Sequence, residues 1–493
     1  MAHSENGALP GGSGPVICWF RVDLRVSDNA ALHAAATSGR PVVCLFILEE
    51  GTPDIRAPGG AKEWWLHYSL GSLKDDLEAL GAPLLLRRGD AGSVLREIIA
   101  QTGADAVVWN RRYGRGETEI DSRIAAELQG ENVSVRAYPG HLIHDPAELR
   151  TGSGAHYKVY TPFWNNLSGR PVADPLPAPG AVRPLPERIA SDDIEDWKLL
   201  PTTPDWSGGI KAFWTPGETG ARERLEEFAK VAFDGYATGR DIPSIDGTSR
   251  LSPHLALGEI SPRQVWHAIE AHADDVPDAD VTTYRKEIAW REFSYHLLHH
   301  YPDMPRENVS SQFEHFPWTE LDEQAAAQLK AWQRGQTGYP IVDAGMRQLW
   351  HIGWMHNRVR MITASFLIKH LLIDWRHGEE WFWDTLVDAD AANNANGWQW
   401  VAGSGADAAP FFRVFNPILQ GKKFDPDGAY VRKWVPEVAA LPDKHVHAPF
   451  DAPDKVLLTA KVRLGESYPR PIIDHSFGRK RALDAYAEMR AAA

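Results

Sequence analysis

Residues 15–48, PVICWFRVDLRVSDNAALHAAATSGRPVVCLFIL, hold two short apolar runs separated by a helical pattern. Short apolar runs bounded by turn residues are typical of buried strands, and strands that alternate with helices form parallel sheets. This alternation continues to about residue 140. The predicted strands cover residues 15–20, 41–48, 83–86, 106–109 and 133–138, and the predicted helices cover 30–37, 61–80, 91–102 and 117–128. The sequence therefore predicts an α/β, Rossmann-like domain with a five-stranded parallel sheet covered by helices on both faces.

The rest of the chain differs in pattern. The turn after the first predicted strand, FRVDLR (20–25), matches neither G-x-G-x-x-G nor a P-loop, so we expect no nucleotide held by those motifs. Residues 148–212 are rich in Pro and Gly and predict a connector on the surface. From about residue 213 the apolar period is helical. We therefore predict a disordered tail (1–13), an α/β domain (14–147), an interdomain connector (148–212) and an all-α domain (213–493).

Composition narrows the classes of function. The 493 residues contain no run of about 18 apolar residues and no secretory signal pattern, so we expect a cytoplasmic protein without a membrane span. Cys18 and Cys44 lie in apolar runs and are expected to be buried thiols, too few for a structural zinc or an iron–sulfur cluster. The net charge of −14 argues mildly against a nucleic-acid partner, but local potential decides binding. The 20 Trp residues are explained either by aromatic packing or by an aromatic ligand or electron path.

Polar residues interrupt the helical half in patterns that have two explanations. In the predicted helix 283–300, Glu287, Trp290 and Arg291 share a face. They form either a surface ion pair beside a packed Trp or part of a ligand site. A predicted helix 355–372 carries Asn357 and Arg358 toward the core, where they need protein partners or an anionic ligand. Hydroxyls and backbone amides of DGTSRLS (246–252) suit a phosphate or a helix N-cap.

The segment DADAANNANGWQW (388–400) predicts a polar loop followed by two Trp residues. Its carboxylates do not follow the EF-hand spacing, so we expect no metal and favour an aromatic ligand with a hydrogen-bonding edge.

These segments together resemble the photolyase/cryptochrome family. The resemblance is carried by residues 246–258 (DGTSRLSPHLALG), 287–293 (EIAWREF), 337–347 (TGYPIVDAGMR), 353–369 and 388–417, and it covers residues 14–490 in register. Residues 199–206, 214–218 and 398–417 are most similar to the bacterial class III photolyases of cyclobutane pyrimidine dimers. The resemblance implies a deoxyribodipyrimidine photo-lyase, in which light drives an electron from reduced FAD to a flipped-out dimer in UV-damaged DNA.

The resemblance also implies roles for individual residues. FAD would be held by Tyr236, Thr248, Ser249, Arg250, Leu251, Ser252, Glu287, Arg291, Trp354, Asn357, Arg360, Asp388, Asp390 and Asn394, with Asp388 paired to Arg360. Asn394 would face the flavin N5, where plant-type cryptochromes usually carry Asp, and its amide cannot titrate. The dimer pocket would be formed by Glu287, Trp290, Asn357, Met361 and Trp400. Enzymes for the (6-4) lesion carry His at the Met361 position, so Met361 favours cyclobutane dimers.

The same resemblance implies partners and further groups. The arginines Arg240, Arg358 and Arg413 would contact the DNA backbone together with Trp290 and Trp400. Trp398 and Trp375 would begin the electron relay that reduces the flavin. The usual third Trp is replaced by Asp322, and Trp318, Trp381, Trp383 and Tyr430 remain alternatives for it.

Three expectations complete the sequence-based picture. An antenna, 5,10-methenyltetrahydrofolate rather than a deazaflavin, is expected on the α/β domain near Trp64, Trp65 and residues 110–113. We expect a bacterial, monomeric enzyme that associates with the nucleoid only through DNA and needs no obligate protein partner. The main alternative is a blue-light photoreceptor cryptochrome without repair activity. We expect that Asn394, Met361, Trp290 and the lack of a long C-terminal extension argue against it.

Overall fold

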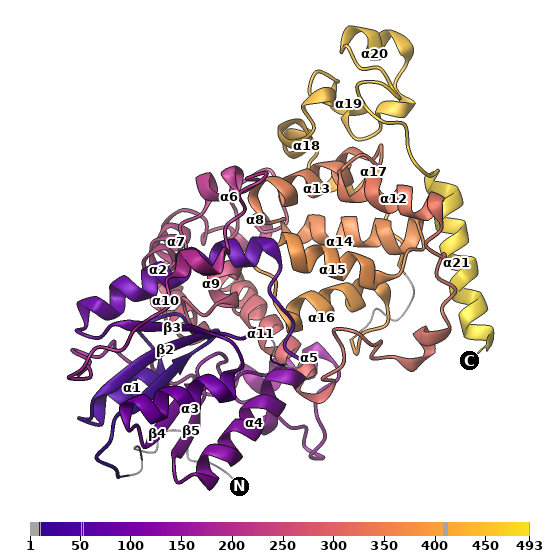
Figure 1. Cartoon of the computed structure of the whole chain (residues 1–493). Helices are drawn as coiled ribbons and strands as arrows, with labels where there is room; N and C mark the ends of the chain where they lie inside the picture. The colour runs from indigo at the N-terminus through magenta and orange to yellow at the C-terminus, as the bar shows by residue number, and fades with distance from the viewer. Residues whose placement is uncertain (1–8, 10, 51, 53, 408–412, 493) are drawn as a thin grey trace. The chain divides into compact units, whose positions relative to one another are not determined.

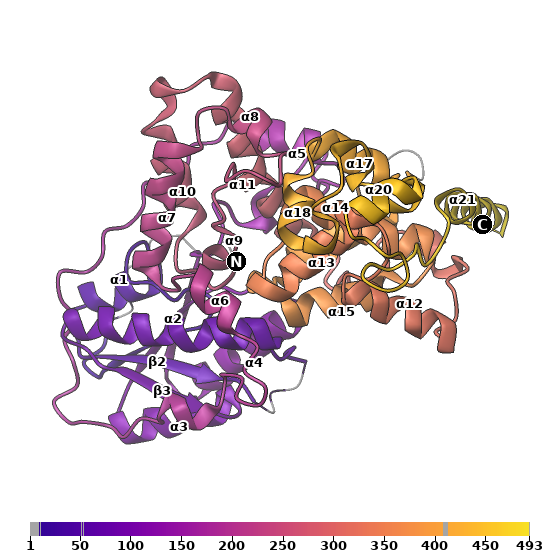
Figure 2. The same cartoon turned by 90° about the horizontal axis from the view of Figure 1, so that it is seen from above.

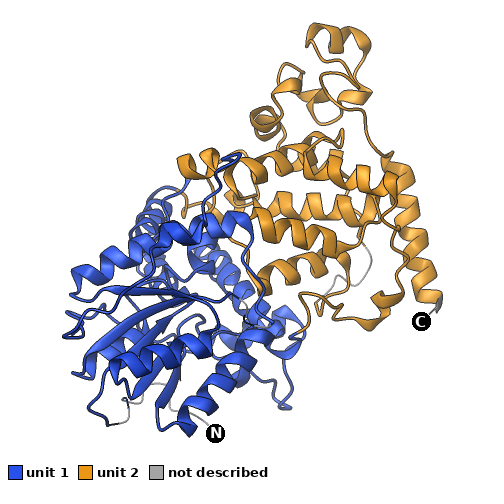
Figure 3. Cartoon of the chain, in the orientation of Figure 1, with its two compact units in different colours: residues 1–206, 214–231, 249–302 blue, residues 207–213, 232–248, 303–493 orange. Residues whose placement is uncertain are grey.

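The computed structural model describes residues 9, 11–50, 52, 54–407 and 413–492. The chain forms two compact units, shown in different colours in Figure 3. Unit 1 comprises Met1–Trp206, Trp214–Val231 and Ser249–Pro302, and unit 2 comprises Ser207–Phe213, Ala232–Thr248 and Asp303–Ala493. These units divide the chain differently from the predicted boundaries, because two segments of the predicted helical domain pack within unit 1. The predicted tail lies largely outside the described residues.

The sheet of unit 1 has the five parallel strands that the sequence predicts. They are β1 (Val16–Phe20), β2 (Val42–Leu48), β3 (Leu84–Arg88), β4 (Ala106–Asn110) and β5 (Ser134–Tyr138). Their spatial order is β3-β2-β1-β4-β5, and every neighbouring pair is parallel. The order reverses between β1 and β4, which is the position where sheets of this kind commonly bind ligands beyond the carboxyl ends of the strands.

Four helices connect the strands: α1 (Ala30–Thr37), α2 (Gly60–Ala79), α3 (Ala91–Thr102) and α4 (Arg115–Gly130). Because crossovers between parallel strands are right-handed, α1 and α2 cover one face of the sheet and α3 and α4 cover the other. Figure 2 shows α2 and α3 on opposite sides of β2 and β3. Side-chain caps fix two of the helix starts, since Asn29 accepts from Leu32 N and Asp90 accepts from Ser93 N.

The remaining elements of unit 1 are helical. They are η1 (Pro146–Glu148), α5 (Tyr160–Leu167), η2 (Ile194–Trp197), α7 (Glu218–Val231), α9 (Ser252–Ala256), α10 (Pro262–Glu270), η3 (Ala273–Asp275) and α11 (Asp278–His300). Two of these, α5 and η2, lie within the predicted connector. The connector is also bound to the body of unit 1, because the Tyr160 hydroxyl of α5 donates to Lys286 O of α11 at 2.7 Å.

The described residues of unit 2 contain helices and no β-strand. Its elements are α6 (Gly208–Phe213), α8 (Tyr236–Gly239), η4 (Ser311–His315), α12 (Glu323–Gln333), α13 (Pro340–Ile352), α14 (Asn357–Ser365), the π-helix η5 (Phe366–His370), α15 (Trp375–Thr385), α16 (Ala391–Ala402), α17 (Pro417–Phe424), α18 (Ala429–Trp434), η6 (Pro436–Val438), α19 (Asp443–Val446), η7 (Pro449–Asp451), α20 (Asp454–Thr459) and α21 (His475–Ala492). Their arrangement can be followed in Figure 1. None of the helices in the described part of the chain combines the length and hydropathy of a membrane crossing.

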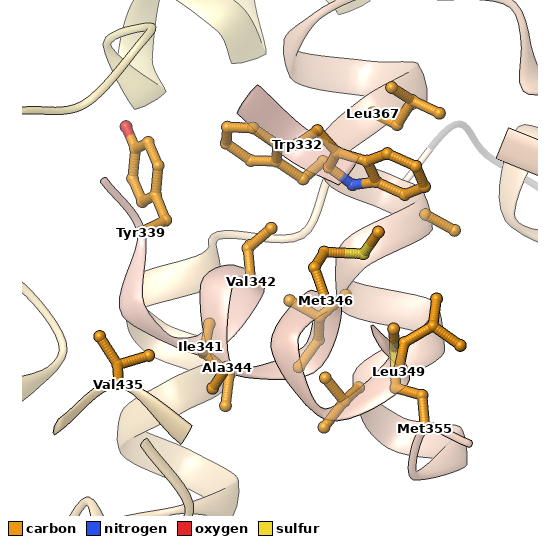
Figure 4. Close-up of a cluster of buried hydrophobic side chains, with 14 of the residues drawn as sticks. Trp332, Tyr339, Ile341, Val342, Ala344, Met346, Leu349, Met355, Leu367 and Val435 are labelled. Atoms are coloured by element: carbon orange, nitrogen blue, oxygen red, sulfur yellow. The ribbon is translucent and has the colours of Figure 1, made fainter. Parts of the chain in front are cut away.

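The core of unit 2 is built around α13 and the segments that pack on it. Figure 4 shows Trp332, Val342, Met346 and Leu349 among its buried side chains. Trp332 is fully buried, and its indole N–H donates to Thr363 O at 3.0 Å, so this Trp is satisfied without a ligand.

The bounds predicted for the helix 355–372 are wrong, because the structure has α14 and then η5 in this segment. The Gly353 backbone is left-handed (φ +66°) and ends α13, so Trp354 lies in a short irregular segment. The His356 ring then caps α14 by accepting from Arg358 N. After Ser365 the backbone continues as η5 rather than as α-helix. Local caps, which the apolar period does not report, therefore decide where these helices begin and end.

Candidate functional site

The unit 1 residues of the predicted cofactor set begin at Ser249. Arg250 has a left-handed backbone (φ +52°), and α9 starts after Leu251 without any side-chain cap. The N-cap explanation for the hydroxyls of this segment is therefore wrong. The Ser249 hydroxyl is instead hydrogen-bonded to Tyr284, a buried residue of α11. Thr248 and Tyr236 belong to unit 2, where Tyr236 is buried at the start of α8.

A buried carboxylate that the sequence did not single out anchors this segment. Glu259 follows α9, is fully buried and is hydrogen-bonded to the His254 ring. Its Oε1 accepts from Trp65 Nε1 at 2.9 Å and from Gly217 N at 2.7 Å. Three elements of unit 1 thus meet at one side chain. Glu259 stands in an ordinary-looking Gly-Glu-Ile sequence, so no local signal could have identified it.

Arg291 of α11 is not part of the surface ion pair that the sequence allowed as an alternative. It is buried, and its guanidinium donates to His141 O at 2.9 Å and to the His141 ring at 2.8 Å. Burial and the neighbouring Arg291 charge hold the pKa of His141 well below its usual value. The ring is therefore neutral and can accept from the guanidinium. Glu292 also lies near this cation, with 3.6 Å between Arg291 Nη1 and Glu292 Oε1.

A second group of predicted residues in unit 2 lies in and just before α14. Trp354 is buried. Asn357 is exposed, so the expectation of a buried Asn is wrong; it stands at the first position of α14 rather than inside the helix. Arg358 donates to Asp241 at 2.6 Å, and its Nη1 lies 3.7 Å from the Met361 sulfur. The predicted pocket residue Met361 and the predicted DNA contact Arg358 thus touch each other.

Arg360 and Asp388 form the ion pair that the resemblance implies. Arg360 Nη2 donates to Asp388 Oδ2 at 2.7 Å, and Arg360 Nε donates to Met355 O at 2.7 Å. Among the described residues none donates to the other oxygen, Asp388 Oδ1, although this atom is buried. A buried acceptor without a protein donor is suited to a ligand that carries N–H or O–H groups.

The segment 388–400 is mostly helical, contrary to the expected polar loop. Asp390 is the N-cap of α16 and accepts from Asn393 N at 2.8 Å, which starts the helix directly after the carboxylates. Asn394 is buried, and its Nδ2 donates to Glu379 Oε1 at 2.8 Å and to Glu379 O at 3.0 Å. Glu379 of α15 was not predicted. Because it takes the amide N–H groups, the Asn394 oxygen remains as the acceptor.

The predicted relay residues are in the core of unit 2. Trp375 is fully buried and donates to Asn308 at 3.0 Å. The Trp398 ring lies 5.0 Å from Phe382 and 6.2 Å from Trp332, measured between ring centroids. Trp400, one of the predicted dimer contacts, is partly buried in α16. The third relay member stays open, since Trp318, Trp381, Trp383 and Tyr430 all pack at the same core cluster.

Two of the predicted DNA-binding arginines already have contacts within unit 2. Besides its pair with Asp241, Arg358 stacks over Phe424 at 4.5 Å, and Arg240 lies 5.7 Å from the Tyr236 ring centroid. Arg413 is exposed.

The residues named for the antenna are engaged inside unit 1. Trp64 and Trp65 are almost fully buried, and Asn110 Nδ2 donates to Asp23 at 2.6 Å. Arg112 pairs with Asp121 at 2.7 Å and with Glu49. Contact of these side chains with an antenna stays a prediction.

Comparison with known proteins gives matches over most of the chain. Residues 16–180 match the DNA photolyase family, and residues 284–488 match the FAD binding domain of DNA photolyase. The chain is 54% identical over 97% of its length to the deoxyribodipyrimidine photo-lyase of Agrobacterium fabrum, of which it covers 98%. It is 35% identical over 99% of its length to cryptochrome-1 of Arabidopsis thaliana, of which it covers 72%.

A solved structure gives the same result for the fold. The crystal structure of a bacterial class III photolyase from Agrobacterium tumefaciens superposes with a TM-score of 0.94, at 52% identity and with 98% and 99% of the two chains covered. The chain belongs to the photolyase/cryptochrome family. Within it, the chain has the sheet domain and the FAD-binding domain of the DNA photolyases.

Proposed function

We propose that this protein is a deoxyribodipyrimidine photo-lyase that uses light to split cyclobutane pyrimidine dimers in DNA. The observation that carries the proposal is Asn394, a buried amide held by Glu379 with its oxygen left as an acceptor. An amide at this position cannot supply or take up a proton, so it favours the reduced flavin needed for repair over the proton transfer used in signalling. The likeness to Agrobacterium photolyases over nearly the whole chain supports the same conclusion.

FAD, when bound, supplies light absorption and the electron whose transfer to the dimer allows two C–C bonds to break. The chain's own residues bind and orient it. The free oxygen of Asp388 suits the donor groups of a flavin nucleotide, and Arg360 fixes that carboxylate. The proposed contacts are Tyr236, Thr248, Ser249, Arg250, Leu251, Ser252, Glu287, Arg291, Trp354, Asn357, Arg360, Asp388, Asp390 and Asn394.

The dimer is proposed to stack on Trp290 and Trp400 and to hydrogen-bond to Glu287, with Asn357 and Met361 lining the pocket. A damaged pair is weakly stacked, so flipping it out of the duplex costs less than flipping an intact base. Arg240, Arg358 and Arg413 are proposed to contact phosphates. They would provide a local positive surface on a chain whose net charge is −14.

The antenna is proposed to be 5,10-methenyltetrahydrofolate rather than a deazaflavin, on the strength of the likeness to a class III photolyase. The enzyme is proposed to act as a monomer in the bacterial cytoplasm, without an obligate protein partner. The absorption spectrum of the purified protein identifies the antenna. Sedimentation with and without damaged DNA tests the monomer.

The test of the function is anaerobic photoreduction followed by blue illumination with a thymine-dimer oligonucleotide, read as recovery of intact-thymine absorbance. We expect recovery that requires light and that is abolished by Glu287→Ala and by Trp290→Ala. Flavin that photoreduces without any recovery of thymine would overturn the proposal and favour a photoreceptor cryptochrome, the alternative indicated by the 35% identity to cryptochrome-1.

A further inference from the structure

Trp290, the proposed platform for the dimer, has one of its faces covered by a tyrosine. The rings of Tyr160 and Trp290 are 3.6 Å apart between centroids, and their planes differ by 4°. Tyr160 begins α5, in the segment that the sequence predicted to be a connector. The two residues are 130 positions apart, and both belong to unit 1.

Further contacts hold both rings of the stack formed by Tyr160 and Trp290. The Tyr160 hydroxyl donates to Lys286 O, one turn before Trp290 on α11. Phe293 stands perpendicular to both rings, with centroids 5.8 Å from Tyr160 and 5.9 Å from Trp290. Phe293 itself is fully buried. The Trp290 ring is thus held between one parallel ring, Tyr160, and one steeply inclined ring, Phe293.

A parallel, closely superposed pair of rings is not the arrangement that aromatic quadrupoles favour, since offset and edge-to-face pairs are preferred. The contact is therefore imposed by the packing of α5 on α11 rather than by the attraction of the two rings. Its consequence is geometric. Trp290 is only partly buried, and with one face occupied by Tyr160 it can offer a flat aromatic ligand only the opposite face.

We propose that Tyr160 is a positioning residue for substrate binding, which backs Trp290 so that the dimer stacks on one defined face in one plane. The inference rests on the proposed function, because it takes Trp290 as the platform for the dimer. Stacking of a base on an aromatic side chain depends on parallel planes. If the Trp290 ring could rotate in the free enzyme, fixing its plane when the dimer binds would cost conformational entropy. That cost would offset part of the stacking energy.

A matched control is available three residues earlier. Tyr157 is as buried as Tyr160, and its hydroxyl also donates to a backbone carbonyl, Arg150 O, at 3.0 Å. Tyr157 stacks edge-to-face with Phe163 rather than with Trp290. Tyr157→Leu therefore removes an equivalent side chain from the same segment without touching the Trp290 face.

The experiment compares Tyr160→Leu, Tyr160→Phe and Tyr157→Leu as FAD-loaded enzymes. Readouts are the affinity for a thymine-dimer oligonucleotide and for its undamaged copy, the repair rate at saturating substrate, and the FAD content. We expect Tyr160→Leu to weaken dimer binding about tenfold while affinity for undamaged DNA, FAD content and saturated repair rate stay near wild type. Tyr160→Phe, which keeps the ring, is expected to retain most of the affinity, and Tyr157→Leu all of it.

Several outcomes would overturn the inference. Equal dimer affinity for Tyr160→Leu and the wild type would do so, as would an equal loss in Tyr157→Leu, which would point to general loosening of the segment. If Tyr160→Leu does not fold, Tyr160→Met, with an unbranched side chain and no ring, replaces it under the same criteria. A wild-type enzyme that neither binds nor repairs dimers would instead overturn the proposed function.

Discussion

Gly378→Ala should displace the ring of Trp398, the first residue of the proposed electron relay. Gly378 lies in α15, where the Trp398 ring of α16 packs directly on its backbone. A Cβ at this position would lie 2.1 Å from Trp398 Cη2, 2.5 Å from Cζ3 and 2.6 Å from Cζ2. Non-bonded carbons in contact are normally about 3.5–4.0 Å apart, so the ring has to move by roughly 1.5 Å.

The surroundings leave the ring little room for this movement. Trp398 is 2% exposed, with Phe382 and Trp332 packed against it at 5.0 and 6.2 Å. Overpacking a filled core in this way costs about 1–3 kcal/mol. Gly397→Ala is the matched control, because Gly397 is an exposed helical residue of α16 with nothing within 4 Å of a new Cβ. Since both changes bring the same gain in helix propensity, the difference between the two variants isolates the overpacking.

The assay is thermal unfolding followed by circular dichroism, combined with the rate of FAD photoreduction. We expect the Tm of Gly378→Ala to lie several degrees below that of Gly397→Ala, at about 2–4 °C per kcal/mol for a unit of this size. We also expect slower photoreduction in Gly378→Ala alone. Equal Tm values for the two variants would refute the packing argument. A lower Tm with unchanged photoreduction would refute the role of Trp398 as the first relay residue.

Three further changes test other parts of the structure. Burial raises the pKa of Glu292 from 4.5 to about 7, so the carboxyl is more readily protonated in the folded state and stability falls as pH rises through this window. The Gln of Glu292→Gln cannot ionise, so the Tm of this variant minus that of the wild type should increase as pH rises from 4.5 to 7. Thermal unfolding of both proteins at each pH measures this difference, and a difference that does not change with pH would contradict the argument. Glu379→Gln allows the Asn394 amide to turn its N–H groups toward the flavin, because a Gln side chain can donate to the Asn394 oxygen as well as accept. The two-electron reduction potential of the flavin should then fall by about 20 mV in a spectroelectrochemical titration, which corresponds to one hydrogen bond of ~1 kcal/mol. An unchanged potential would exclude the role of Glu379 in orienting Asn394. Gln399→Leu leaves one buried and two partly buried backbone groups, Met304 O, Glu307 O and Val309 N, without their hydrogen bonds to this side chain. A buried group left without a partner costs about 1–3 kcal/mol, so Tm should fall by several degrees. No change in Tm would show that these groups find other donors and acceptors.

Much of the fold could be predicted because its signals are local. The bounds of α1 and α3 agree with the sequence to the residue, since Asn29 and Asp90 cap the helices at their expected starts. The strands agree within one or two residues because buried apolar runs flanked by Pro or Gly have few alternatives. The change from α14 to the π-helix η5 after Ser365 was not predicted, because the apolar pattern continues through it. The start of α14 lies two residues later than predicted, because the His356 ring caps the helix there.

The site was predicted less completely than the fold. The ion pair of Arg360 and Asp388 that the resemblance implies is confirmed, whereas the roles given to the other site residues stay predictions. The explanations drawn from periodicity alone failed where partners come from other elements. Arg291 donates to the carbonyl and the ring of His141, 150 positions away in the chain, and the DGTSRLS hydroxyls do not cap α9.

The sequence by itself determined the parallel sheet, the helical character of the second half and the identity of the proposed site residues. Only the tertiary structure decided which groups hold those residues: Glu259 behind α9, Glu379 on Asn394 and Tyr160 on Trp290. The physical reason is that periodicity reports which face of an element is buried, whereas hydrogen bonds and ring stacks form between faces that only the packing of distant segments brings within 3–4 Å.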